Sequence, residues 1–204
     1  GDAGGDAQQV TAAIPMTAPD QPTPPPAADA NDIARLKSEL DALAARDIAT
    51  ARAIRDGLPA GSLDRHVLAW TIALYGGDKV PSGEIAATAA SLPGWPGLTT
   101  LRKNSERAIY RENPDPQTVI KAFGGSQPLT AEGVILLARA YRAQGNTEAA
   151  LSVLTPFWRT EKLEAKDEAA IIAEFGAIIP VADHRFRMER MFYADRAESA
   201  NRVA

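Results

Sequence analysis

The sequence has no cysteine, only two histidines and few aromatic residues, and each shortage excludes a class of site. Without cysteine there is no disulfide, zinc–thiolate centre, iron–sulfur cluster or thiol nucleophile. The two histidines, His66 and His184, stand far apart in the chain and have no ligand-like neighbours. We therefore expect no bound metal, no cofactor and no catalytic histidine.

Long hydrophobic runs are also missing. No stretch approaches the roughly 20 apolar residues that cross a bilayer, and no charged-then-apolar leader stands at the start, so any signal peptide has been removed. The net charge of −4 and the pI near 5.3 argue against nucleic-acid binding through a simple basic patch. A composition of 45% hydrophobic and 24% charged residues is that of a globular protein.

The composition changes sharply near residue 30. Residues 1–30 contain no lysine or arginine and carry six prolines, and their four aspartates account for the whole net charge. Proline fixes φ and removes a backbone donor, so this stretch predicts a disordered, semi-stiff tether, with a proline-rich ligand as the alternative. Residues 31–204 are neutral overall and form the predicted folded part.

From residue 31 onward, good helix formers carry apolar residues at spacings of three and four, and strand-like alternation is not sustained. Glycine and proline pairs separate the segments. The sequence predicts nine helices, over about 31–56, 62–75, 81–92, 98–113, 115–123, 130–144, 147–160, 165–178 and 180–204.

The helices over 130–144 and 147–160 read as an antiparallel pair. Six residues match the tetratricopeptide pattern, namely Leu137, Ala138, Tyr141, Gly145, Ala150 and Phe157. We therefore predict an all-α fold, a right-handed superhelical solenoid of helical hairpins over 31–204. The last helix reaches Ala204 without a stop signal, which predicts that the solenoid continues beyond this fragment.

A search for catalytic chemistry finds no residue to assign. The glycine pairs lack the spacing of phosphate-binding loops, and no Gly-x-Ser-x-Gly motif occurs. The acidic residues between 161 and 168 fit a helix start, where the dipole favours negative charge.

Two features remain as candidate binding surfaces. The segment 184–193 interleaves cations with large apolar residues, which fits either a helix packed on two faces or an anionic-ligand or saccharide surface. Trp95 lies in a Pro/Gly turn and either packs on the following helix or stacks on a sugar ring. The candidate glycan or partner surface therefore consists of Trp95, His184, Arg185, Arg187 and Arg190.

Residues 64–204 resemble the N-terminal helical part of soluble lytic murein transglycosylases. The resemblance is carried by residues 68–74 (LAWTIAL), 101–108 (LRKNSERA), 157–160 (FWRT) and 179–185 (IPVADHR). It implies an exported, periplasmic protein with a superhelical domain that leads into a C-terminal lysozyme-like domain. That domain cleaves the glycan strands of peptidoglycan to 1,6-anhydromuramoyl products with a single glutamate.

The catalytic elements of that family do not occur in this chain. Glu198-Ser199 matches its Glu-Ser pair, but the Gly-Leu-Met-Gln and Ala-Tyr-Asn-Ala-Gly elements are missing, so Glu198 is not assigned the catalytic role. The resemblance implies a non-catalytic scaffold, or a surface for glycan or other cell-wall proteins, in a larger enzyme. The alternatives are a free-standing tetratricopeptide-like interaction scaffold and, less favoured, an all-α enzyme without a recognisable acid, base and pocket.

Overall fold

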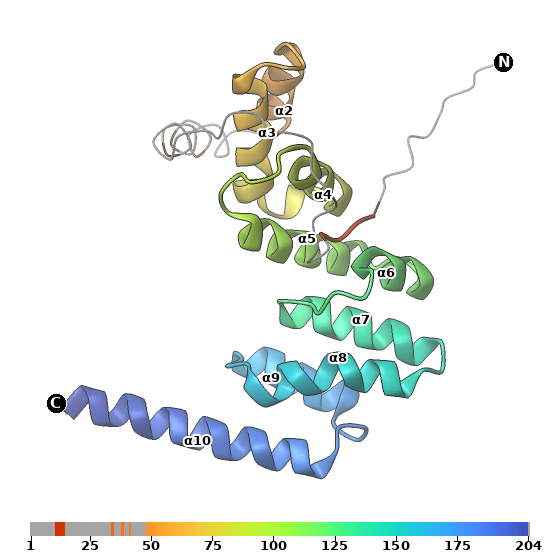
Figure 1. Ribbon diagram of the computed structural model, residues 1–204, viewed down its shortest axis with the longest axis vertical. Coiled ribbons are helices and arrows are strands. Elements are labelled where there is room, and N and C mark those ends of the chain that lie inside the picture. The colour runs from red at the N-terminus through yellow and green to blue at the C-terminus, as the bar shows by residue number, and fades with distance from the viewer. Residues whose placement is uncertain (1–10, 15–33, 35–37, 39–40, 42–47, 204) are drawn as a thin grey trace. The chain divides into compact units, whose positions relative to one another are not determined.

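The computed structural model describes residues 11–14, 34, 38, 41 and 48–203, and every regular element within them is a helix (Figure 1). No strand occurs in this part of the chain, so the all-α prediction is confirmed for it. The helix predicted over 31–56 is described only at residues 34, 38, 41 and from 48 onward, and its expected N-cap at residues 31–32 lies outside the described residues. None of the described helices is long and apolar enough to span a bilayer.

Nine α-helices and one short 3-10 helix make up the described part. The α-helices are α2 (Ile48–Gly57), α3 (Leu63–Tyr75), α4 (Ser82–Ser91), α5 (Leu98–Glu112), α6 (Pro116–Phe123), α7 (Ala131–Ala143), α8 (Thr147–Thr160), α9 (Ala165–Phe175) and α10 (Val181–Val203), and the 3-10 helix η1 covers Gly77–Lys79. From residue 62 onward the predicted boundaries agree with the observed ones to within three residues.

The boundaries are set by local capping chemistry. At the start of α3, the Ser62 hydroxyl accepts a hydrogen bond from the Arg65 amide at 3.3 Å, and Thr130 caps α7 in the same way at 3.0 Å. These side chains satisfy amides that have no partner inside the helix. At the end of α5, Asn113 adopts a left-handed conformation with φ of 45°. The following Pro114 also prevents the helix from continuing.

The described residues divide into two compact units. The first contains the residues up to Pro114 together with Lys121–Ser126, and the second contains Asp115–Ile120 and the residues from Gln127 onward. In the first unit, α3 packs against α2, α4 and α5. Its core gathers around Trp70, Ile72, Ile85, Leu92 and Leu101, all of them almost completely buried.

Residues 11–14 differ from the predicted tether, because they pack against the first unit. Ala13 is buried, and Ile14 lies partly buried against the apolar core. The Ala12 amide donates a hydrogen bond to the Ser82 hydroxyl at 3.1 Å. These four residues have no regular secondary structure but contact the first unit, which the prediction of a tether did not anticipate; the rest of residues 1–30 lies outside the described part.

In the second unit, α7 and α8 form a helical hairpin and α10 packs against α8 (Figure 1). The turn between α7 and α8 uses Gly145 with φ of +75°, a conformation in which a side chain would be strained. Buried residues on the facing sides include Val134, Leu137, Ala138, Ala150 and Leu154. Three of these belong to the tetratricopeptide pattern, so that pattern places core residues of the hairpin correctly.

Candidate functional site

Trp95 lies in the core of the first unit, and its ring has no free face. It is 3% exposed, and its centroid is 5.5 Å from that of Trp70 on α3, at an interplanar angle of 55°. The neighbouring Pro96 carbonyl accepts a hydrogen bond from Trp70 Nε1 at 2.9 Å. One interpretation of the sequence has Trp95 packing on the helix that follows it. In the structure its ring packs against Trp70 on the preceding helix α3. Stacking on a sugar would require an exposed ring face, which Trp95 lacks.

The other four candidate residues lie on α10, in the second unit, where they divide between two environments. Arg187 is only 4% exposed. Its Nη1 donates to the carbonyl oxygens of Trp158 at 2.8 Å and Glu161 at 2.7 Å, at the end of α8. Its Nη2 donates to Glu168 Oε2, in the first turn of α9, at 2.7 Å.

Arg187 therefore joins three helices and is not part of an accessible surface. Its guanidinium carbon also lies 4.4 Å from the Trp158 ring centroid, a cation–π distance. The carbonyls at the end of α8 have no partner within that helix, so a buried arginine satisfies them and complements the negative end of the helix dipole. The candidate ligand role of Arg187 is replaced by a structural one.

His184 also faces the interior of the second unit. Its Nε2 lies 3.1 Å from the carbonyl oxygen of Gly176, and its ring meets Trp158 edge-on, with centroids 5.6 Å apart. A carbonyl oxygen only accepts hydrogen bonds, so Nε2 carries the proton in this contact. These two contacts connect the first turn of α10 to α8 and to the segment that follows α9.

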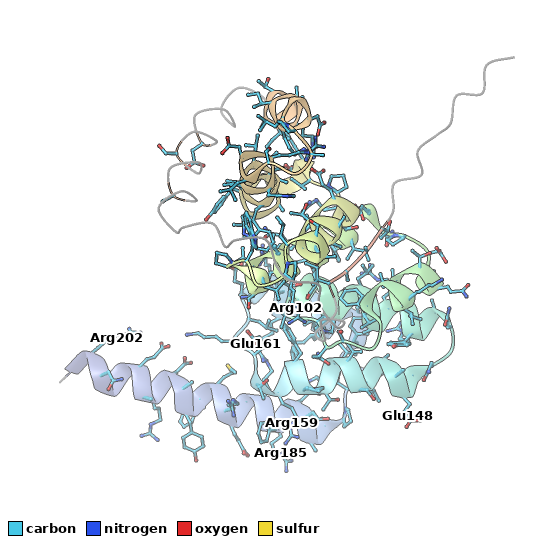
Figure 2. All side chains as sticks on the ribbon, turned by 45° about the horizontal axis from the view of Figure 1, so that its top comes forward. Arg102, Glu148, Arg159, Glu161, Arg185 and Arg202 are labelled. Atoms are coloured by element: carbon cyan, nitrogen blue, oxygen red, sulfur yellow. The ribbon has the colours of Figure 1, made fainter. Side chains whose placement is uncertain are left out.

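The exposed cations of α10 are accompanied by exposed apolar side chains. Arg185 and Arg190 are exposed, and Arg185 is labelled on the lower helix of Figure 2. We use the name α10 outer face for five exposed residues at helical spacings of three, four and one: Arg185, Met188, Phe192, Tyr193 and Arg196. Met188 is 73% exposed, Phe192 57% and Tyr193 68%, which is unusual for side chains of this size.

Side chains of the α10 outer face contact one another. The Phe192 and Tyr193 rings lie edge to face, with centroids 5.9 Å apart, and the Arg196 guanidinium carbon is 5.4 Å from the Phe192 centroid. By the helical period Arg190 lies next to the Tyr193 edge of this face, three residues before Tyr193, and the exposed Glu189 lies on the same side, four residues before Tyr193. Of the residues predicted from sequence, Arg185 lies on this face and Arg190 lies at its edge.

Sequence reasoning missed Arg196 and Arg159. Arg159, on α8, places its guanidinium carbon 3.9 Å from the Phe186 centroid, and its Nε lies 3.5 Å from Asp183 Oδ1. The sequence does contain a signal for Arg196, because Arg196 follows Phe192 by four residues and residues at that spacing are neighbours on a helix. It was not available for Arg159, because its partners come from a different helix.

No group of three or more potential metal ligands occurs among the described residues. Glu198, the first residue of the Glu-Ser pair noted in the sequence, is exposed on α10 and pairs with Lys162. Lys162 Nζ lies 2.9 Å from Glu198 Oε1, and this hydrogen bond lowers the pKa of Glu198 below its usual value. In the structure Glu198 is therefore half of an exposed ion pair with Lys162.

Replacing Lys162 with glutamine should raise the pKa of Glu198 toward its usual value. The depressed pKa means that the pair stabilises the fold above the unfolded pKa of Glu198, and that this contribution is lost as pH falls through the folded pKa. An NMR titration of the Glu198 carboxyl carbon measures the change. Lys166→Gln, next to Glu164 at 3.6 Å, is the matched control and should leave the Glu198 titration unchanged; an unchanged pKa in Lys162→Gln would contradict the pairing.

Comparisons of the chain with protein-family models, with curated proteins and with solved structures found no match. The resemblance to lytic transglycosylases thus rests on the sequence segments quoted above. The structure adds one accessible feature to them, the α10 outer face, and assigns Trp95, His184 and Arg187 to packing.

Proposed function

We propose that this chain is a non-catalytic helical region of an exported, periplasmic peptidoglycan lytic transglycosylase, and that the α10 outer face binds the glycan. The observation that carries the proposal is the combination of exposed aromatic rings and arginines on that face. Aromatic rings stack on the apolar faces of sugars, and arginines pair with the carboxylates of muramoyl groups and peptide stems. The family is supported by the four sequence segments.

The finer architecture is part of the same proposal. We expect the hairpins to continue as a right-handed superhelix of tetratricopeptide-like repeats, with the catalytic lysozyme-like domain in a further part of the protein. The support is that α7 packs on α8, and α3 on α2 and α4, so that most helices meet their sequence neighbours within each unit. Such a region would hold glycan or other cell-wall proteins while the chemistry occurs elsewhere.

Purified murein sacculi test the glycan proposal in a sedimentation assay. The wild-type chain should sediment with sacculi, and the double substitution Phe192→Ala with Tyr193→Ala should weaken binding by about tenfold or more, since each stacked ring contributes on the order of 1 kcal/mol or more. Val181→Ala is the matched control, because Val181 is a 76% exposed apolar residue on the same helix but outside the face. Equal binding by wild type and the double variant would contradict the assignment of this face.

The same incubation tests the non-catalytic part of the proposal. We expect no release of 1,6-anhydromuropeptides, measured by chromatography and mass spectrometry, and detectable release would overturn the proposal that this chain is non-catalytic.

The exposed Met188 and Phe192 also favour a second candidate function, a protein-interaction scaffold, because adaptable apolar side chains suit protein interfaces. Absence of sedimentation with sacculi would favour that candidate over the glycan-binding one.

A further inference from the structure

The first residue of α4, Ser82, presents an oriented hydrogen-bond acceptor to residues 11–14. The Ser82 hydroxyl donates to Glu112 Oε2 at 2.6 Å, and the Ser82 amide donates to Glu112 Oε1 at 2.8 Å. Since a hydroxyl has a single hydrogen, Glu112 fixes its direction and leaves the oxygen lone pairs to accept. The Ser82 hydroxyl is thereby suited to receive a backbone amide from outside.

Residues 11–14 use this acceptor. They form a non-helical stretch beside α4 and α5 in Figure 1, and the Ala12 amide donates to Ser82 Oγ at 3.1 Å. Ala13 is 9% exposed, and Ile14 packs against the core cluster that contains Trp70 and Ile85. Ser82 itself is fully buried. One backbone hydrogen bond and two apolar side chains thus hold the segment in place.

We infer that this surface, formed by Ser82, Glu112 and the adjoining edge of the core, is a docking site for a short apolar peptide in a non-helical conformation. Residues 11–14 of the same chain are its resident occupant. The recognition is of a main-chain amide followed by a small and then a branched apolar side chain. The main-chain hydrogen bond orients the peptide, and the contacts of the two apolar side chains give specificity.

The docked segment is exchangeable on energetic grounds. A single neutral hydrogen bond and a partly buried isoleucine give only weak affinity for a separate peptide. Covalent attachment compensates, because a tethered ligand experiences an effective concentration on the order of millimolar. A peptide of the same pattern therefore competes with residues 11–14, and it gains access when the resident segment is weakened.

A peptide-binding experiment with the full chain tests the site. The probe is a fluorescein-labelled peptide with the sequence of residues 9–16, QVTAAIPM, and its anisotropy reports binding. Ile14→Asp in the protein should expel the resident segment, so the probe should bind this variant about fivefold or more tightly than wild type. The same peptide with aspartate in place of isoleucine should not bind. Equal binding to both proteins, or to neither, would overturn the inference.

Hydrogen exchange provides a second measurement that does not depend on a peptide. The Ala12 amide should be protected in the wild type, and Ser82→Ala should accelerate its exchange by about tenfold or more, as expected for loss of a specific hydrogen bond. Persistent protection of α3 and α5 amides shows that the variant is folded. Ser91→Ala, at the other end of α4, removes a hydroxyl that bonds only within its own helix, to the Thr88 carbonyl, and should change nothing at Ala12. An Ala12 amide that is unprotected in wild type, or indifferent to Ser82→Ala, would refute the site.

Discussion

Replacing Arg187 with alanine should lower the free energy of unfolding of the second unit by about 2–4 kcal/mol, because two carbonyls are left without partners and Trp158 loses its cation. Glu168 contributes less to this cost, since its side chain is 43% exposed and can turn to water. Urea unfolding measures the loss. Hydrogen exchange should rise first in α10, whose attachment to α8 and α9 depends on this guanidinium.

Two further variants separate the roles of charge and geometry at this position. Arg187→Lys retains the charge but offers no planar fork to reach the carbonyls and the carboxylate together, so it should be intermediate in stability. Arg185→Ala removes an exposed arginine from the same helix and should change stability by no more than about 0.5 kcal/mol. Similar losses of unfolding free energy for Arg185→Ala and Arg187→Ala would show that stability depends on the overall positive charge of α10 and not on the burial of Arg187.

The helix boundaries could be predicted because their determinants are local. Ser62, Asn113 and Gly145 each act within a few residues, through a cap or a left-handed conformation, and these residue types have the same effect in most contexts. Hydrophobic spacing then identified the helices between these signals. Only the stretch before residue 48 lies outside this test, because the structure describes few of its residues.

The candidate site was harder to predict, because it depends on which face of α10 is covered. Helical spacing groups His184, Arg187 and Met191 on one face, but it does not tell whether an arginine on that face is buried or exposed. Arg187 is buried because Glu168 and the end of α8 supply its partners. Those partners lie 19 and 26 residues away in sequence, so no local pattern reveals them.

The packing of residues 11–14 was missed for a related reason. Composition describes a segment as a whole, and the surrounding glycines, aspartates and prolines of residues 1–30 outweigh one isoleucine. The contact depends on Ser82, 70 residues away from Ala12. A short docking segment inside a polar stretch can therefore be recognised only when the surface that receives it is known.

Truncating Leu137 to alanine should cost about 2–5 kcal/mol, the range for a large aliphatic side chain removed from a close-packed core. Leu137 is 2% exposed and lies on α7 within the hairpin with α8, where no water can fill the space that the side chain leaves. Phe157→Ala on α8 should have an effect in the same range, since Phe157 is 7% exposed. Thermal or urea unfolding, followed by the helical circular dichroism signal, measures both.

The control for these core substitutions is Ile172→Ala on α9. Ile172 is 48% exposed, so its truncation should change stability by no more than about 0.5 kcal/mol although the chemical change is similar in size. A cost at Leu137 as small as that at Ile172 would mean that the α7–α8 hairpin relaxes around the cavity and is not rigidly packed. Costs that differ as expected would show that buried side chains of the α7–α8 hairpin contribute far more to the stability of the second unit than an exposed side chain of similar size.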